Sequence, residues 1–309
     1  MSVEAEPTGG DQFGLPGSGA RALAPTPTWS FRPRPKVASD TKVAAREMVN
    51  AAKRRRAAPV RKVFVRTDME DPAPLSQLAR IGGRGGAVAI KLYLALLWRC
   101  SSAPFHTDKP ARAWASLLAL EEPETKGALR ISAALKTLEA ANLITVNRLP
   151  GRNVVTVLDE SGDGSDYQLP STEYYLASMK GSSGQEQARR NRYFKISSRW
   201  WTEGDLQTLK GPGLIMLLIL LAEQGGDDKL FADGGVGKGV WFSTTVFPAR
   251  YRVSHKTRAA GTRELLTRRL LIVEREALPD VPGSVFARRR YRNIYKLINP
   301  PSDDVPDGT

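Results

Sequence analysis

The sequence predicts an α+β fold in which one module, a helix followed by a hairpin of two strands, occurs twice. The stretches 134–146 (ALKTLEAANLITV) and 261–273 (GTRELLTRRLLIV) carry the same pattern at an offset of 127 residues (261 − 134). The aligned apolar pairs are Leu138 with Leu265, Leu143 with Leu270, and Val146 with Val273. Each stretch reads as a helix that ends on a polar or basic stub and turns at once into a short apolar strand. Such an internal repeat indicates two copies of one structural unit.

Length and composition are those of a globular protein with room for two domains. The chain has 309 residues, of which 41% are hydrophobic and 25% charged, so a packed core is expected. The most apolar run, 214–222, is far shorter than the roughly 20 residues that span a bilayer, and no signal peptide is visible. The single cysteine, Cys100, and the two histidines, His106 and His255, form neither a disulfide framework nor a familiar zinc motif. We therefore expect a soluble, cytoplasmic protein that uses no metal or cofactor and does not contact a membrane.

The charge balance indicates a polyanionic partner. The formal net charge is +14 and the sequence pI is about 10.0. Because like charges repel one another in the compact state, such a surplus seldom serves folding. Nucleic acid is the commonest polyanion that it serves, and an anionic membrane surface is the second. A DNA-binding protein of this kind is expected to associate with the nucleoid.

The N-terminal residues predict a tail. Residues 1–38 are rich in Gly, Pro, Ala, Ser and Thr and have no apolar periodicity, which predicts disorder. Within them, 29–36 (WSFRPRPK) mixes aromatic and basic side chains. This stretch is either a solvated linker or a short docking peptide or DNA-backbone arm.

A basic helical arm is expected over 39–58. Ser39 and Asp40 are suited to cap a helix over 41–57. The arm ends in a run of four cations, which are Lys53, Arg54, Arg55 and Arg56. They are either a solvated helix end, which the helix dipole favours, or a contact to phosphate groups.

The first domain is predicted over residues 61–158. Its elements are expected at 62–66 (strand), 87–100, 111–120 and 128–142 (helices), and 143–146 and 154–158 (strands joined by a turn at 150–153). In the third helix Ile131, Leu135 and Leu138 are spaced to face a core. A strand, three helices and a two-stranded hairpin, in that order, are the elements of a winged helix.

The second domain, predicted over 192–298, repeats this order after a Gly- and Ser-rich linker at 159–191 with a brief helix at 173–179. Its elements are expected at 193–196 (strand), 213–224 (helix), 240–243 (strand), 244–251 and from Ser254 onward (helices), and 270–274 and 290–297 (strands joined by a wing tip at 279–283). Residues 299–309 read as an acidic tail. The predicted fold class is therefore α+β, with two tandem winged helix-turn-helix domains and a disordered basic N-terminal tail.

Several stretches of the second domain resemble known DNA-binding proteins. Residues 253–257 (VSHKT), 263–266 (RELL) and 270–273 (LLIV) resemble the helix-turn-helix of winged-helix DNA-binding proteins. The opening strand YFKI, the apolar helix and the WFS strand resemble those of plasmid-type replication initiators in particular. The resemblance covers about residues 61–298. It implies two winged helices in one chain and a division of labour between them.

The third helix of the second domain is the candidate DNA reader. A helix fits the major groove of duplex DNA, and its first residues then lie nearest the bases. Lys256 and Arg263 can donate to guanine, and a small residue such as Ala259 admits the thymine methyl group. Ser254 at the helix N-terminus suits a phosphate, although capping is certain to be part of its role. The candidate residues of this helix are Ser254, His255, Lys256, Thr257, Arg258, Ala259 and Arg263.

The wing of the second domain is the other candidate contact. It carries Arg288, Arg289, Arg290 and Arg292. Wing arginines commonly reach the DNA backbone or the minor groove. Because three adjacent arginines alternate between the two faces of a strand, some of them are alternatively a solvated strand end, just as His255 is alternatively an exposed loop residue.

The second domain departs from the helix pattern at Arg258 and Thr262. At the offset of 127 the first domain has the apolar residues Ile131 and Leu135 there (258 − 131, 262 − 135). Either the stem of Arg258 lies on the core with its head in solvent, or the helix is rotated from this alignment. The choice decides which side chains face DNA.

The first domain offers less charge for the same task. Its candidate contacts are Arg130, Ser132 and Lys136 on the third helix and Arg152 on the wing. This domain is expected either to bind DNA weakly or to serve as the surface of a homodimer.

A glycine-rich stretch at 233–239 (DGGVGKG) looks like the phosphate loop of partition ATPases. Gly239 stands where the hydroxyl residue that holds magnesium is needed, and a strand rather than a helix is expected next. No catalytic Ser/His/Asp set or carboxylate pair stands out elsewhere, and Cys100 reads as a small buried residue rather than a nucleophile. We therefore expect a protein that is not an enzyme.

Three functions fit these expectations. The first is sequence-specific binding of double-stranded DNA that starts replication at a plasmid or mobile-element origin and recruits the host replication helicase. The second is a transcription regulator of the same fold, for which no segment outside the two domains is long enough to form an effector pocket. The third is a segregation or assembly protein that uses winged helices for protein contacts, against which the basic helix and wing of the second domain argue.

Overall fold

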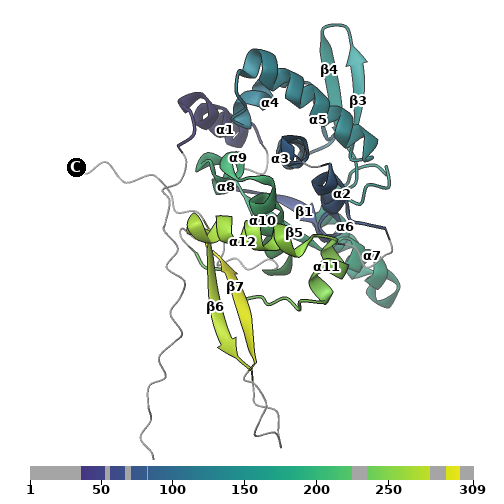
Figure 1. Ribbon diagram of the computed structural model, residues 1–309. Coiled ribbons are helices and arrows are strands. Elements are labelled where there is room, and N and C mark those ends of the chain that lie inside the picture. Colours follow the sequence, from purple (N-terminus) through teal and green to yellow (C-terminus); the bar gives the residue numbers. More distant parts are fainter. Residues whose placement is uncertain are drawn as a thin grey trace, which may run out of the picture. The chain divides into compact units, whose positions relative to one another are not determined.

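The computed structural model describes residues 36–52, 56–66, 71–81, 83–224, 235–278 and 290–299 (Figure 1). It is a mixed α+β structure with small sheets, as the sequence predicts. Outside the described residues lie the predictions for the tail up to residue 35, for Lys53, Arg54 and Arg55, for the wing tip with Arg288 and Arg289, and for residues 300–309.

The first helix, α1 (Ser39–Ala51), is shorter than predicted and packs against the rest of the molecule. Its N-cap is Ala38, without a side-chain hydrogen bond, so the predicted capping by side chains is wrong. Thr41 Oγ1 donates to Ser116 O over 3.0 Å, and Ala45 is fully buried. The predicted arm is therefore attached to the core at its first turns.

The predicted helix end, Ala57, is the first residue of the strand β1 (Ala57–Arg61). Pro59 explains the difference, because its ring cannot occupy a helix interior and it forces Ala58 toward extended backbone. The strand predicted at 62–66 is also wrong, since the 3₁₀ helix η1 (Lys62–Phe64) begins there. The predicted boundary between the arm and the first domain thus falls inside a strand.

The predicted order of helices and hairpin in the first half is confirmed. The elements are α2 (Pro74–Arg80), α3 (Gly83–Arg99), β2 (His106–Thr107), α4 (Ala111–Leu117), the π-helical turn η2 (Pro123–Gly127), α5 (Ala128–Ala140), β3 (Ile144–Leu149) and β4 (Arg152–Val157). Helix α2 and strand β2 were not predicted from the sequence. The short β2 joins the hairpin to give a three-stranded antiparallel sheet of order β2-β4-β3. We refer to α3 through β4 as the first module.

The second half has the same order of elements. They are β5 (Tyr193–Ser197), α8 (Arg199–Thr202), α9 (Asp205–Thr208), α10 (Gly211–Gln224), α11 (Val246–Tyr251), α12 (His255–Thr267), β6 (Leu271–Ala277) and β7 (Tyr291–Leu297). The strand predicted at 240–243 is wrong: Val236 and Val240 only form isolated bridges to the β7 side, because Ser243 already accepts hydrogen bonds from Thr245 N and Val246 N at the start of α11. We refer to α10 through β7 as the second module.

The repeat seen in the sequence is also a repeat of backbone hydrogen bonds. At the helix–strand junction, Leu143 N donates to Leu138 O and, 127 residues later, Leu270 N donates to Leu265 O. All four leucines are fully buried. Two residues before each strand the backbone is left-handed in both copies, with φ of 54° at Asn142 and 58° at Arg269. The two modules therefore share one local structure.

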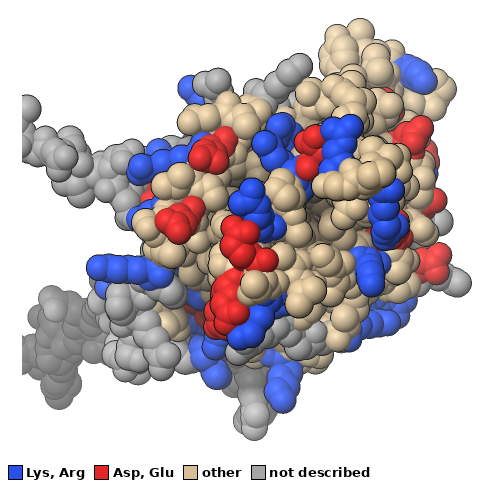
Figure 2. All heavy atoms as spheres, turned by 90° about the horizontal axis from the view of Figure 1, so that it is seen from above, with Lys and Arg blue, Asp and Glu red and all other residues tan. Residues whose placement is uncertain are grey.

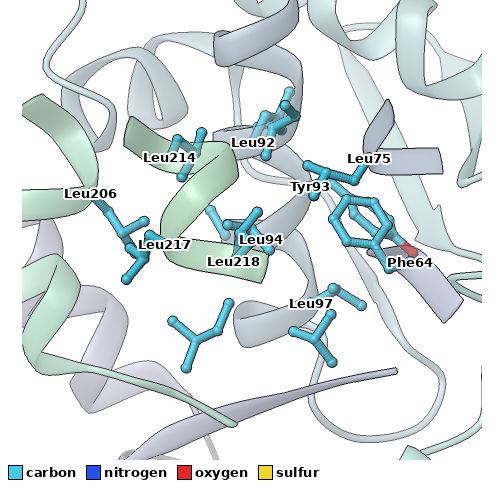
Figure 3. Packing of buried hydrophobic residues seen from close by; sticks show 14 of the residues in the cluster. Phe64, Leu75, Leu92, Tyr93, Leu94, Leu97, Leu206, Leu214, Leu217 and Leu218 are labelled. Atoms are coloured by element: carbon cyan, nitrogen blue, oxygen red, sulfur yellow. The ribbon is translucent and has the colours of Figure 1, made fainter. Parts of the chain in front are cut away.

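The two modules are joined more closely than two tandem domains would be. The strands that precede the two modules pair with each other: β1 and β5 are antiparallel, with Pro59 opposite Lys195. Figure 3 shows Leu92 and Leu94 of α3 packed near Leu214 and Leu218 of α10, and one hydrophobic cluster runs through both modules. Antiparallel pairing of equivalent strands could not be read from either strand alone.

The segment 159–191, predicted as a flexible linker, is structured. It contains α6 (Pro170–Met179), which includes the predicted helix, a 3₁₀ turn η3 (Gly181–Gly184), and α7 (Gln185–Arg190). The composition misled the prediction because Gly184 is needed for close packing: a Cβ there would collide with Ala177 O of α6. We call this segment the insert.

Arg61 at the end of β1 holds both ends of the insert. Its guanidinium donates to Glu160 and lies 3.2 Å from Asp159 Oδ2. The same side chain donates to Gln168 O (2.9 Å) just before α6 and to Asn191 Oδ1 (2.7 Å) just after α7. Burial raises the pKa of the Glu160 carboxyl to about 7, although the nearby charge of Arg61 lowers it. This buried cluster fixes the insert on the first module.

The close approach of α12 to α10 depends on Gly261, the counterpart of Ala134 in the first module. A Cβ at Gly261 would collide with Pro212 O and lie 2.6 Å from Met216 Cγ. Because Pro212 O belongs to the backbone, we expect Gly261→Ala to lower the free energy of unfolding by about 1–3 kcal/mol in urea denaturation. A Cβ at Gly85 in α3 meets nothing within 4 Å, so Gly85→Ala is expected to raise stability by about 0.5–1 kcal/mol. Equal effects of the two substitutions would contradict this packing.

Candidate nucleic-acid interface

A tight connection joins helices α11 and α12. Arg252 takes a left-handed conformation with φ of 50°, and Val253 turns into the core. Ser254 is the N-cap of α12, as predicted: its Oγ accepts a hydrogen bond from Thr257 N over 3.1 Å. The hydroxyls of Ser254 and Thr257 also lie 3.0 Å apart, so both candidate residues serve the helix terminus. The first turn of α12 is thereby fixed in place.

One face of α12 is buried and the other carries the predicted contacts. Gly261 and Leu265 are buried against the core. The exposed residues are His255, Lys256, Ala259, Ala260 and Arg263. Lys256, Ala260 and Arg263 follow one another at spacings of four and three residues, which places them on one face of a helix. The surface of α12 thus has a cation near each end and small side chains between them.

Arg258 is half-buried and already has partners on the protein, so its assignment as a DNA contact stays a prediction. Its guanidinium lies over three aromatic rings, 4.5 Å from the centroid of Phe247, 5.4 Å from that of Phe242 and 5.6 Å from that of Tyr295. It also donates to Tyr295 Oη over 3.1 Å. Neither of the two arrangements expected from the sequence is observed. The charged head itself is held against aromatic rings of β7, of α11 and of the segment before α11, whereas Ile131, at the equivalent position of the first module, is a fully buried apolar residue.

The β6–β7 hairpin has two faces with different charge. Leu271, Tyr295 and Leu297 are buried, so their face looks toward the helices. Side chains alternate along a strand, so every second residue points to the same face. Arg275 and Asn293 pair with each other and therefore lie on this inner face, closer to the tip of the hairpin than Tyr295. Arg275 lies over the ring of Tyr291 at 4.2 Å, and no carboxylate pairs with it among the residues that the structure describes.

The outer face of the hairpin is neutralised by ion pairs. Lys296 Nζ lies 2.8 Å from Glu274 Oε1, and Arg292 Nε lies 2.7 Å from Glu276 Oε2. The Arg292 guanidinium also lies 5.6 Å from the ring centroid of Trp241. Of the predicted wing residues, Arg292 therefore already has partners on the protein, whereas Arg290 is exposed at the end of β7.

Sequence reasoning missed several residues of this interface. Arg252 is exposed in the turn between the two helices, and Ala260 is exposed on α12. Arg275, Tyr291 and Asn293 lie on the inner face of the hairpin. The alternation of Leu271, Val273 and Arg275 in the sequence was the available signal, but only the register with β7 assigns these residues to a face.

The predicted contacts of the first module are weaker. On α5, Arg130 is half-buried, Ser132 Oγ donates back to Ala128 O over 3.1 Å, and Lys136 is exposed. On the hairpin, Arg152 lies 3.6 Å from Asp108 Oδ2. Figure 2 shows Lys and Arg intermingled with Asp and Glu on the face seen from above, the side where α4 and α5 lie in Figure 1. The described charges on this side do not form a continuous basic patch.

The offset of 127 allows the two exposed helix faces to be compared position by position. Leu129, which is 71% exposed, stands at the position of Lys256 (129 + 127). Lys136 stands at the position of Arg263 (136 + 127). The acidic residues Glu122 and Glu124 precede α5 and pair with Lys126 and Arg112. The face of α5 is therefore less cationic than the face of α12.

The remaining candidate residues divide between described and undescribed parts of the chain. Arg56 is exposed immediately before β1. The part of the glycine-rich stretch that is described, from Gly235 onward, does not lead into a helix: Gly237 N donates to Leu297 O, and Gly239 packs on Ile294. This stretch therefore forms an extended segment beside β7 rather than a phosphate loop.

The described residues give little support for a nucleophilic cysteine, a metal site or a membrane-spanning helix. Cys100 is buried as predicted, and burial raises the pKa of its thiol to about 12, so it is a poor nucleophile at neutral pH. The residues that the structure describes contain no cluster of three or more His, Cys, Asp or Glu side chains arranged to bind a metal. None of the helices among them combines the length and apolar character needed to cross a membrane.

Comparison with known proteins gives no family for this chain: no protein-family model matches it, and neither a curated protein nor a solved structure is similar to it.

Proposed function

We propose that each module is a winged helix and that the second module binds double-stranded DNA. The supporting observation is the sorting of charge in the second module. Lys256 of α12 and Arg275 of the inner hairpin face are exposed and have no ion pair among the described residues, whereas Glu274 and Glu276 cover the outer face in ion pairs. A surface that attracts phosphate on one side only is expected of a hairpin that lies along DNA.

In this proposal α12 enters the major groove. Lys256 and Arg263 then donate to guanine O6 or N7, and Ala259 and Ala260 allow the helix to approach base edges closely. His255, in the first turn, is near enough to a base or phosphate to donate a hydrogen bond. The capped N-terminus of α12, fixed by Ser254 and Thr257, is directed toward the phosphate backbone.

The hairpin supplies contacts to the backbone on one side of α12. Arg275 is the proposed phosphate ligand, with Asn293 opposite it on the same inner face. Arg290, which directly precedes β7, alternates to the outer side together with Arg292. Arg258 keeps this hairpin at a fixed distance from α12 through Tyr295 and is a positioning residue rather than a contact.

The wing can be tested by the salt dependence of binding. Each lost phosphate contact lowers the magnitude of the slope of log K against log salt by about 0.9, so Arg275→Ala should reduce it by roughly 1. Fluorescence anisotropy with a labelled duplex measures this slope. The salt concentration is varied from about 50 to about 300 mM, where phosphate contacts make the affinity strongly dependent on salt. Lys296→Ala on the outer face is the matched control and should leave the slope nearly unchanged. A larger effect of Lys296→Ala than of Arg275→Ala would place the DNA on the outer face of the hairpin.

The biological role that we propose is initiation of replication at a plasmid or mobile-element origin, with recruitment of the host helicase. Support comes from the presence of two modules in one compact chain, which allows contacts to two neighbouring stretches of DNA or to DNA and a protein. Selection of bound fragments from genomic DNA tests this role. Repeated sites near the protein's own gene support initiation, whereas a single palindrome at a promoter supports a transcription regulator.

A further inference from the structure

The insert exposes an apolar stripe on α6. Four large side chains of this helix are exposed: Tyr174 (39%), Tyr175 (61%), Leu176 (51%) and Met179 (71%). Tyr175, Leu176 and Met179 lie at spacings of one, three and four residues, so they form one continuous strip along the helix. The opposite side of α6 is buried through Pro170 and Ala177. In Figure 1, α6 and α7 lie at the right-hand edge of the molecule.

This strip is held rigidly. Gly184 brings the turn before α7 into contact with Ala177 O. Arg61 binds the chain on both sides of the two helices, at Gln168 O and at Asn191 Oδ1. The ring of Tyr174 packs edge-on against that of Tyr193, with centroids 6.3 Å apart. A fixed apolar strip loses little conformational entropy when a partner covers it.

Two charged residues lie along one edge of the strip. Glu173 is at the N-terminal end and Lys180 directly follows the C-terminal end. They are seven residues apart, which is close to two helical turns, so they lie on the same side of the helix. Neither has an ion pair among the described residues. An acid and a base at opposite ends of one edge are self-complementary when two such helices meet in antiparallel orientation.

We infer that the α6 strip is a dimer interface whose occupant is the α6 strip of a second copy of this chain. A two-fold axis perpendicular to the helix places Glu173 of each copy beside Lys180 of the other, and stacks the Tyr175, Leu176 and Met179 side chains between them. A parallel two-fold arrangement would place the charged edges of the two copies on opposite sides, so neither ion pair would form. The charges therefore select the antiparallel dimer.

The strip is small, so the dimer is weak and reversible. Its exposed apolar area is on the order of a few hundred Å² per copy, below the roughly 800 Å² per partner of standard stable interfaces. Association in the micromolar range is expected. The sequence led us to expect a homodimer surface on the first domain, and we now place it on the insert that follows. The inference does not depend on DNA binding.

A charge-swap experiment tests the dimer without DNA. Sedimentation velocity of the full-length chain, from about 1 to 300 µM, should show a concentration-dependent shift from monomer to dimer. Glu173→Lys and Lys180→Glu, each alone, should weaken association roughly tenfold, because both ion pairs become like-charge contacts. An equimolar mixture of the two variants should associate at least as well as the wild type, because both pairs are restored in the mixed dimer.

The apolar part of the interface has its own control. Tyr175→Ser with Met179→Ser should leave the chain monomeric, whereas Leu129→Ser, which changes an equally exposed side chain on α5, should leave the dimer intact. All these positions are exposed or half-buried, and circular dichroism verifies folding of each variant. A wild-type chain that stays monomeric over the whole range, a mixture that fails to restore association, or a dimer lost in Leu129→Ser would each overturn the inference.

Discussion

Replacing Lys256 and Arg263 with alanine is expected to weaken binding to the preferred duplex by about 2–6 kcal/mol, because each lost base contact costs about 1–3 kcal/mol. Binding to unrelated duplexes should weaken much less, so the ratio of specific to non-specific affinity falls. Both side chains are exposed on α12, and the fold of the variant is expected to stay intact. Competition binding at a fixed salt concentration measures the two affinities.

The repeat supplies a matched control for this experiment. Leu129→Ala with Lys136→Ala changes the corresponding positions of α5, 127 residues earlier. Because the face of α5 is less cationic, this pair should lower specific affinity by less than about 1 kcal/mol. If the first-module pair had the larger effect, α5 rather than α12 would be the DNA-reading helix.

Removing the Arg61 guanidinium is expected to cause the largest loss of stability. Arg61→Met leaves Asp159 and Glu160 buried without their cation, and breaking a buried pair in this way costs about 3–5 kcal/mol. It also releases both ends of the insert from β1. Urea denaturation at pH 7.5 measures the loss. Arg190→Met is the control, because Arg190 pairs with Asp163 at the exposed surface, where such pairs contribute less than about 1 kcal/mol.

The loss should also depend on pH in a defined direction. The pKa of Glu160 is raised to about 7 from its ordinary 4.5 by burial, so between these values the folded state binds more protons than the unfolded state. The contribution of this carboxyl to stability is therefore complete below about pH 4.5 and is lost as the pH rises through 7. Without Arg61, which opposes this shift, the decline between pH 5.5 and 8 should become steeper. A variant as stable as the wild type, or one whose stability rises over this range, would contradict the role of the buried cluster.

Features carried by local periodicity were predictable from the sequence. The apolar spacing of Leu138, Leu143 and their counterparts identified both helix–strand junctions, and the hydroxyl of Ser254 identified the start of α12. Features that depend on contacts between residues far apart in the sequence could not be predicted from it. The pairing of β1 with β5 joins residues more than a hundred positions apart, and the order of the insert depends on Arg61, a residue of another element. Glycine and serine composition alone indicated flexibility there.

In the candidate interface, too, only the features carried by local periodicity were predictable from the sequence. Exposure of Lys256, Ala259 and Arg263 followed from the helix pattern, but the position of Arg258 did not, because three aromatic rings from separate elements surround it. The face of the hairpin that Arg275 occupies is likewise determined by its register with β7.

The central claim is that α12 reads base edges of duplex DNA in the major groove. Selection of binding sites from a random duplex library, followed by interference footprinting with guanines methylated at N7, tests it most directly. The account predicts a defined enriched motif in which N7 methylation of one or more guanines blocks the wild-type chain, and no such motif for the chain with alanine at positions 256 and 263. Failure of the wild-type chain to retain any duplex at low ionic strength, or a motif that is selected equally well by that variant, would contradict it.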